Sequence, residues 1–161
     1  MFLKPDYNVE NIYAIDLEEL QKVGIKAMLF DLDSTLMASK SGAYTLKTLD
    51  WLDKVSQNFF IGVISNNKNP EYIKKVQAIS DFPILFDANK PSSVKAAQFM
   101  KEHGITAETA VLVGDRPLTD IWCGKKLGCK TILVDSITAK TENMPTRFVR
   151  KLERCCIRNW G

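Results

Sequence analysis

Two acidic residues separated by a single leucine, Asp31 and Asp33, follow a short apolar run that begins at Lys26. If this run forms a strand and the backbone stays extended, residues two apart point to the same side, so the two carboxylates share one small space. Two close carboxylates tend to separate in pKa, because one stays ionised while the other holds a proton. Such a pair suits a carboxylate nucleophile beside a general acid. The alternative is that an acid after a strand only caps the next helix.

Ser65 ends a second apolar run, residues 59–64, and two asparagines follow it. Its hydroxyl and the backbone N–H groups behind it, including that of Asn66, have the chemistry to cradle phosphate oxygens at a strand-to-helix turn. The same Ser-Asn-Asn sequence is also ordinary turn chemistry. Lys90 stands just before Pro91, where its ammonium group could neutralise a nucleophile and a phosphate. Alternatively, Lys90 is a solvated surface lysine.

A further acidic cluster begins at Asp115, which follows the apolar residues 110–113 and Gly114. A carboxylate at the end of a buried strand can supply a hard oxygen ligand to Mg²⁺. Asp120 lies about one helical turn further on, where it could support the same site through water. An acid near a helix N-terminus also stabilises the helix dipole, so this cluster has a purely structural explanation as well.

The elements that must position these residues alternate along the chain. Apolar runs predict strands at 26–31, 59–64, 83–86, 110–113 and 131–134. Helical spacing, caps and turn residues predict helices at 16–23, 44–56, 70–79, 91–103 and 118–127. This alternation predicts an α/β fold: a three-layer, Rossmann-like parallel sheet with helices on both faces. Ligands bind such sheets at the carboxyl ends of the strands, which is where every polar cluster above falls.

The order of the four clusters is more specific than any one of them. DxDxT at 31–35, a strand-ending Ser65, Lys90 and GDxxxxD at 114–120 resemble, in order and spacing, the four motifs of the haloacid dehalogenase (HAD) superfamily of phosphohydrolases. The resemblance covers about residues 26–135. Within the superfamily the chain is most similar to the YqeG-type family of small phosphatases, which itself resembles the mitochondrial phosphatidylglycerophosphate phosphatases. Two departures leave the acids intact: Ser34 stands where Asn is usual, and Arg116-Pro117 replaces Gln-Leu.

The resemblance implies a mechanism. Asp31 attacks phosphorus and forms an aspartyl-phosphate, while Asp33 protonates the leaving oxygen and then activates water. Mg²⁺, the expected cofactor, is bound by Asp31, by the backbone carbonyl of Asp33 and by Asp115. Transfer of the phosphoryl group to an acceptor other than water stays open.

The remaining motif residues are expected to serve the phosphoryl group. Ser65, Asn66 and Lys90 bind it, and Thr35 and Asp120 support the site. Only 29 residues separate Thr35 from Ser65, and 24 separate Ser65 from Lys90. One helix and one strand fill each interval, which leaves no room for the cap domain that many HAD enzymes place over the site. We therefore expect a capless enzyme with an open active site.

An open site favours a phosphate carried by a macromolecule or a membrane, so a lipid phosphate such as phosphatidylglycerophosphate is one expected substrate. A phosphorylated sugar or nucleotide is the alternative within phosphatases. A third hypothesis is a non-catalytic module that docks on a membrane through a basic tail. Retention of Asp33 argues against this third hypothesis, because its carboxylate has little purpose outside acid/base catalysis.

Composition sets the broad class. Hydrophobic residues make up 45% and charged residues 25% of the 161 residues, as in an ordinary globular domain. We expect one domain spanning 1–161 and a cytoplasmic location, because no apolar run approaches the roughly 20 residues that span a bilayer. A zinc site is not expected, since the chain has one histidine and no CxxC pair.

The net charge of +3 is concentrated in the C-terminal tail. Residues 146–160 predict a basic amphipathic helix that would lie on an anionic membrane at the inner membrane face. The alternative is that its apolar side packs on the sheet. The rest of the chain carries one net negative charge, so no nucleic-acid partner is expected. The basic residues of the tail are Arg147, Arg150, Lys151, Arg154 and Arg158.

Overall fold

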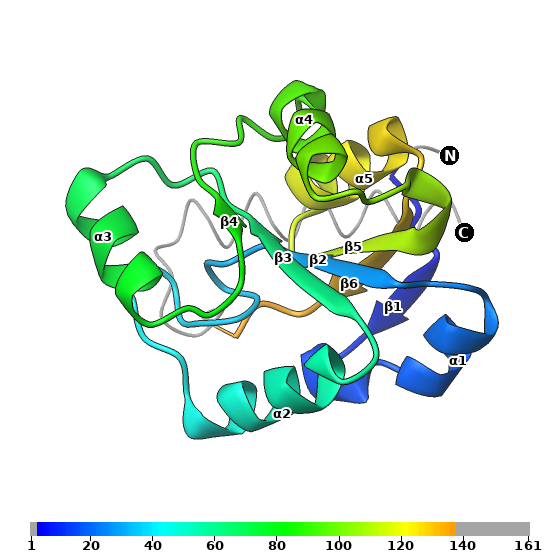
Figure 1. The fold of residues 1–161 in the computed structure, drawn as a ribbon, viewed down its shortest axis with the longest axis horizontal. Coiled ribbons are helices and arrows are strands. Elements are labelled where there is room, and N and C mark those ends of the chain that lie inside the picture. Colours follow the sequence, from blue (N-terminus) through cyan, green and yellow to red (C-terminus); the bar gives the residue numbers. More distant parts are fainter. Residues whose placement is uncertain (1–2, 138–161) are drawn as a thin grey trace.

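Six parallel strands form one sheet in the order β1-β6-β5-β2-β3-β4 (Figure 1). The structure is a computed structural model that describes residues 3–137, so the predicted basic helix at 146–160 lies outside the described residues. Five strands confirm the sequence predictions. The strands are β1 Tyr7–Val9, β2 Ala27–Phe30, β3 Phe60–Ile64, β4 Ile84–Leu85, β5 Ala110–Gly114 and β6 Lys130–Val134.

The first strand, β1, was missed by the sequence analysis. It is three residues long, Tyr-Asn-Val, and lies at the edge of the sheet, where it pairs in parallel with β6. A three-residue edge strand with an exposed polar residue in its middle carries no apolar run, which is the signal on which the other strands were predicted.

Five α-helices connect the strands. Three begin at capping side chains, because Asp16, Thr45 and Asn69 each accept a hydrogen bond from the backbone N–H three residues later. The cap at Asp16 confirms the predicted start of the first helix. The helices are α1 Leu17–Lys22, α2 Leu46–Ser56, α3 Pro70–Ala78, α4 Val94–Glu102 and α5 Trp122–Leu127.

Two helix predictions need correction at their N-terminal ends. Pro91 does not open α4, which begins at Val94, because a turn closed by a hydrogen bond from the Ser92 N–H to the Asn89 carbonyl comes first. The helix predicted from residue 118 begins as a separate, wider turn, a π-helical turn over Pro117–Ile121, and continues as α5. Such turns are often found at functional sites, and this one contains Asp120.

Both faces of the sheet are covered, which confirms the three-layer prediction (Figure 1). Alternate residues of the central strand β2 point to opposite faces. Met28 and Phe30 belong to a cluster of buried side chains with residues of α1, α2 and α3. Leu29 belongs to a second cluster with residues of α4 and α5, such as Phe99. Because β2 is buried on both faces, its four residues are all apolar.

The register of the sheet brings the predicted site residues to one edge. Phe30, the last residue of β2, lies between Val113 of β5 and Val63 of β3. The residues that follow these strands therefore emerge side by side. Between β2 and β3 the described chain has one helix, α2, and between β3 and Lys90 it has α3 and β4. Neither interval holds a separate folding unit, in agreement with the prediction of a capless fold.

No helix within residues 3–137 combines the length and the apolar character that crossing a membrane requires.

Candidate active site

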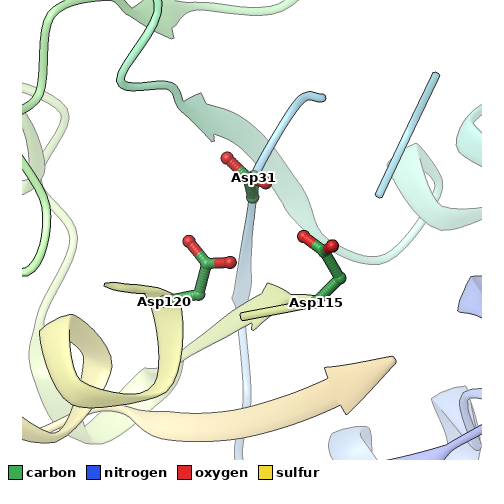
Figure 2. Close-up of side chains that lie close together, drawn as sticks. All are labelled: Asp31, Asp115 and Asp120. Atoms are coloured by element: carbon green, nitrogen blue, oxygen red, sulfur yellow. The ribbon is translucent and has the colours of Figure 1, made fainter. Parts of the chain in front are cut away.

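Three carboxylates meet beyond the carboxyl ends of β2 and β5 (Figure 2). Asp31 follows β2, Asp115 follows β5, and Asp120 comes from the π-helical turn. One oxygen from each carboxylate lies within 4.8 Å of the others. Asp115 and Asp120 are fully buried. Closely spaced carboxylate oxygens are the ligands that Mg²⁺ prefers, so these residues fit a divalent cation.

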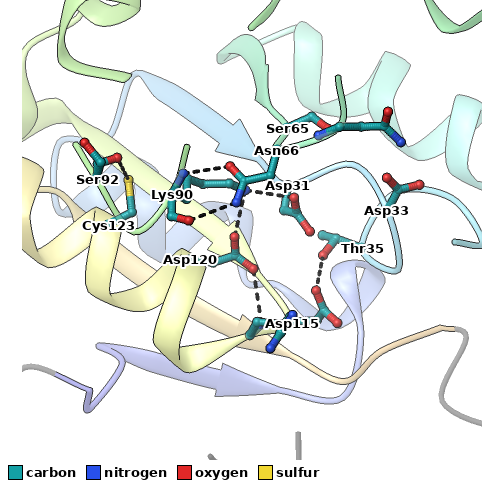
Figure 3. A network of polar contacts seen from close by, with 12 residues as sticks. Asp31, Asp33, Thr35, Ser65, Asn66, Lys90, Ser92, Asp115, Asp120 and Cys123 are labelled. Carbon is teal, nitrogen blue, oxygen red and sulfur yellow. Dashed lines mark hydrogen bonds and ion pairs between the residues drawn. The ribbon is translucent and has the colours of Figure 1, made fainter. Parts of the chain in front are cut away.

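Lys90 lies at the centre of a network of polar contacts (Figure 3). Its Nζ is 2.8 Å from Asp31 Oδ1 and 2.8 Å from Asp120 Oδ1. The side chain is 1% exposed, so these two ion pairs are shielded from water. Burial alone lowers the pKa of Lys90, but the adjacent carboxylates of Asp120 and Asp31 outweigh it and raise that pKa above its usual value. Lys90 therefore stays charged throughout the physiological pH range.

Asn66 holds the backbone of Lys90 in place. Its side-chain Nδ2 donates to the Lys90 carbonyl at 2.9 Å, and its Oδ1 accepts from the Lys90 N–H at 2.7 Å. The side-chain amide thus forms hydrogen bonds with both the N–H and the carbonyl group of Lys90, a residue 24 positions later in the sequence. This contact gives the Asn66 side chain a positioning role that its place in a Ser-Asn-Asn turn did not predict, whereas contact of its backbone N–H with a phosphate stays a prediction.

The charge state of Asp31 reflects its surroundings. Its side chain is 15% exposed. Burial and then the charge of Asp120 raise the pKa of Asp31 to about 7, although the ammonium of Lys90 pulls that pKa in the opposite direction. Without a bound cation, the negative charge on Asp31 is therefore costly. A divalent cation beside Asp31 would favour the ionised form.

Asp120 is fixed by both of its oxygens. Oδ1 binds Lys90, and Oδ2 accepts the backbone N–H of Arg116 at 3.2 Å. The close approach of this side chain to β5 requires a glycine at position 114, because a Cβ there would collide with the Asp120 carboxylate. The first and last residues of the GDxxxxD sequence, Gly114 and Asp120, are thus in close contact.

The carboxylate of Asp33 does not join the other three acids. Its Oδ1 accepts the hydroxyl of Tyr72 at 2.6 Å and the backbone N–H of Lys40 at 2.9 Å. The strand β2 ends at Phe30, and the backbone turns at Ser34, directly after Asp33, where φ is 69°. Asp33 nevertheless lies near enough for its charge to contribute to the raised pKa of Asp31.

Thr35 and Ser65 lie next to the network around Lys90 (Figure 3). The Thr35 hydroxyl donates to Asp115 Oδ1 at 3.3 Å, which orients the carboxylate and supports the predicted role of Thr35. Ser65 is buried directly after β3, and its Oγ accepts the backbone N–H of Asn67 at 3.1 Å. Binding of a phosphate oxygen by its hydroxyl group stays a prediction.

Three residues of this site were missed by sequence reasoning: Tyr72, Lys40 and Gly114. Tyr72 lies on the first turn of α3, and its contact with Asp33 depends on how that helix packs over the loop after β2. The backbone N–H of Lys40 reaches Asp33 because Lys40 adopts a left-handed conformation, with φ of 58°. Gly114 was visible as part of a motif, but its steric role requires the position of Asp120.

The sequence matches a family model described as HAD-hydrolase-like over residues 87–153. A probable phosphatase, YqeG, of Bacillus subtilis is 29% identical over 153 residues, which cover 95% of this chain and 88% of that protein. Phosphatidylglycerophosphate phosphatase 1, chloroplastic/mitochondrial, of Arabidopsis thaliana is 30% identical over 168 residues. That match covers 99% of this chain but 48% of the Arabidopsis protein, so the chain spans about half of that relative's length.

Solved structures agree on the fold. An uncharacterized protein from Listeria monocytogenes serotype 4b superimposes with a TM-score of 0.59 at 19% identity, over 68% of this chain and 78% of that one. The cobalt-bound deoxy-D-mannose-octulosonate 8-phosphate phosphatase of Haemophilus influenzae gives a TM-score of 0.51 at 16% identity, over 70% and 69%. Taken together with the site, these matches show that the chain resembles the phosphatases of the haloacid dehalogenase superfamily in its sequence and in its fold, and they support a phosphatase activity.

Proposed function

We propose that this protein is a Mg²⁺-dependent phosphomonoester hydrolase that works through a phospho-aspartate on Asp31. The observation that supports the proposal best is the pairing of Asp31 with Lys90 at 2.8 Å inside a cluster of three carboxylates. Asp31 and Asp115, with the backbone carbonyl of Asp33, would hold the cation. The cation would supply positive charge that offsets the phosphoryl oxygens and keeps the Asp31 carboxylate ionised.

Asp31 is placed to act as the nucleophile. One of its oxygens forms a bond to phosphorus while the bond from phosphorus to the leaving alcohol breaks. Lys90, already charged and buried, offsets the negative charge of the phosphoryl group during this transfer. Asp120 and Asn66 act on Lys90, the first through an ion pair and the second through its backbone, so both are positioning residues.

Asp33 supplies the acid/base step. Its carboxyl group gives a proton to the leaving oxygen and then accepts one from the water that hydrolyses the aspartyl-phosphate. Tyr72 and the backbone of Lys40 hold this carboxylate on the far side of Asp31 from Lys90. Ser65 and the backbone N–H of Asn66 bind phosphoryl oxygens, and Thr35 orients Asp115.

The lack of a cap between the motifs supports a choice of substrate. Neither interval between the motifs holds a cap, so a phosphate on a large or membrane-borne molecule can reach Asp31. One relative is named a phosphatidylglycerophosphate phosphatase, which favours a lipid phosphate of this kind as the substrate. A phosphorylated sugar or nucleotide is the second candidate, since an open site admits these as well. Contact with an anionic membrane through the tail stays a prediction, because residues 146–160 lie outside the described chain.

A trapping experiment tests the nucleophile. Wild-type protein, incubated with Mg²⁺ and an aryl phosphate, is quenched and reduced with borohydride, which converts an aspartyl-phosphate to homoserine. Peptide mass spectrometry is expected to place homoserine at position 31. Asp31→Asn is expected to show neither homoserine nor turnover, whereas Asp53→Asn, on an exposed position of α2, keeps both. Turnover by Asp31→Asn, or homoserine at another position, would contradict the proposal.

Hydrolysis rates on a panel of phosphate esters then rank the substrates. We expect short-chain phosphatidylglycerophosphate to have a higher kcat/KM than glucose 6-phosphate or a nucleoside monophosphate. The reverse order would favour the sugar or nucleotide alternative. EDTA is expected to abolish activity on every ester, and added Mg²⁺ to restore it.

A further inference from the structure

A hollow of about 560 Å³ is lined in part by Tyr72 and Lys40, the two residues that donate hydrogen bonds to Asp33. Three segments form it: the loop that follows Asp33, the loop between β3 and α3, and the first turns of α3. The mechanism proposed above assigns no role to the side chains that surround it, apart from Tyr72. Its lining includes Lys40, Asn67, Lys68, Glu71, Tyr72 and Lys75.

Two of the lining residues bind the acid/base carboxylate. Tyr72 donates its hydroxyl to Asp33 Oδ1 at 2.6 Å, and Lys40 donates its backbone N–H to the same oxygen at 2.9 Å. A third, Asn67, donates its backbone N–H to Ser65 Oγ. The hollow therefore adjoins both the group that protonates the leaving oxygen and the residue proposed to bind the phosphoryl group. In a phosphate ester held at this site, the part of the molecule next to Asp33 is the leaving group.

The charges around the hollow are mainly positive, with Lys40, Lys68 and Lys75 against Glu71. Among residues 3–137, no carboxylate oxygen lies within 4.0 Å of any of these three ammonium groups. Lys75 donates instead to the backbone carbonyl of Ser41 at 3.1 Å, which leaves its charge uncompensated. Three cations without carboxylate partners around one hollow produce a local field that favours an anion.

We propose that this hollow binds a second anionic group on the leaving group of the substrate. The inference rests on the proposed function and narrows it: the preferred ester is an alcohol that carries the scissile phosphate and, a few atoms away, a phosphate or phosphodiester. Lys68 and Lys75 contact that second anion by electrostatic attraction. The lysines are exposed, so solvent and salt screen the attraction and each contributes a modest factor to affinity.

Binding to a catalytically inactive protein tests the inference without depending on turnover. Asp31→Asn protein with Mg²⁺ is titrated with propane-1,3-diol bisphosphate and, separately, with the monophosphate of the same diol. The ratio of the two dissociation constants measures how much the second phosphate contributes to affinity. We expect the bisphosphate to bind about tenfold more tightly, and 0.5 M salt to remove most of this preference; these figures are order-of-magnitude expectations for two screened ion pairs.

Lysine variants in the same background locate the effect. Lys68→Gln combined with Lys75→Gln is expected to lower the preference about three- to tenfold. Lys74→Gln is the matched control, because Lys74 is an exposed lysine on the same helix that does not line the hollow. Thermal unfolding shows whether each variant folds. Equal affinity for the two diol phosphates, or an equal loss of preference in Lys74→Gln and in the double variant, overturns the inference.

A third ligand separates the two sources of the second anion. Short-chain phosphatidylglycerophosphate carries it as a lipid phosphodiester. If this lipid binds more tightly than the bisphosphate and its binding depends on Lys68 and Lys75, the second anion of the substrate is a lipid phosphodiester. If the lipid binds more weakly but with the same dependence, the substrate is a bisphosphate without a lipid part. Wild-type turnover is measured in parallel. If Asp31→Asn prefers the bisphosphate but the wild-type protein turns over none of the esters, the binding site is supported while the hydrolase proposal is refuted, so the two failures are distinct.

Discussion

Replacement of the proposed nucleophile is expected to stabilise the metal-free protein while it abolishes turnover. In the folded state, burial and the charge of Asp120 raise the pKa of Asp31 from 3.8 to about 7. An Asp31 residue in the unfolded chain keeps the lower value. Between pH 4 and pH 7 the folded protein therefore holds a proton that the unfolded chain has released, so the folded state loses stability as the pH rises.

The size of this effect follows from the two pKa values. A pKa raised from 3.8 to about 7 corresponds to about 4 kcal/mol of unfavourable free energy for the ionised form at pH 8. Asn has nearly the same shape as protonated Asp and carries no charge. Asp31→Asn is therefore expected to gain close to zero at pH 4 and up to about 4 kcal/mol at pH 8 in the free energy of unfolding.

Urea unfolding in EDTA at several pH values measures this gap, the difference in free energy of unfolding between Asp31→Asn and wild type. Asp53→Asn serves as the control, because Asp53 is exposed on α2 and its replacement is expected to change stability by less than about 0.5 kcal/mol at every pH. Mg²⁺ is expected to stabilise wild type more than Asp31→Asn, since it offsets the same charge. A gap that is absent at pH 8, that has the opposite sign, or that does not vary with pH would refute the reasoning.

Three further outcomes follow from the geometry. Asp33→Asn is expected to lower kcat on alkyl phosphates about 100- to 10,000-fold but less on p-nitrophenyl phosphate, whose leaving group needs no proton; equal losses on both esters would contradict the acid role. Tyr72→Phe removes one of two hydrogen bonds to Asp33, so kcat should fall about tenfold or less, and an unchanged kcat would argue against a positioning role. Gly114→Ala should displace Asp120, because the added Cβ collides with its carboxylate. We expect calorimetry to show weaker Mg²⁺ binding in this variant; unchanged binding would contradict the prediction.

The residues that meet in the site could be predicted from the sequence because the rule that brings them together is simple. Parallel strands end at one edge of the sheet, and each polar cluster follows a recognisable apolar run. The register then places the residues after β2 and β5 side by side, since Phe30 pairs with Val113. Nothing beyond strand order and strand ends was needed to bring Asp31 near Asp115.

Contacts that depend on the direction of a side chain could not be predicted in this way. The sequence predicted that Asp33 lies close to Asp31, but not that its carboxylate accepts hydrogen bonds from the hydroxyl of Tyr72 and the backbone N–H of Lys40. The side-chain amide of Asn66 similarly satisfies the backbone of Lys90, a contact that no local pattern indicates. Such contacts depend on loop conformation, which the spacing of apolar residues does not determine.

The separation of Asp31 from Asp33 gives the site a direction. On one side, Lys90 pairs with Asp31 and Asp120 within the network of Figure 3, and the carboxylate of Asp115 lies close to theirs, so this side fits a divalent metal. On the other side, Asp33 adjoins a hollow whose lysines have no carboxylate partners among the described residues. A phosphate ester fits this polarity in one orientation only. In the proposed complex, the phosphoryl group lies against the carboxylate cluster and Lys90, and the leaving group points past Asp33 towards the lysines. An ester bound the other way round would place its leaving oxygen far from Asp33, the proposed proton donor, so under this proposal the charges that select the substrate also align it for the acid step.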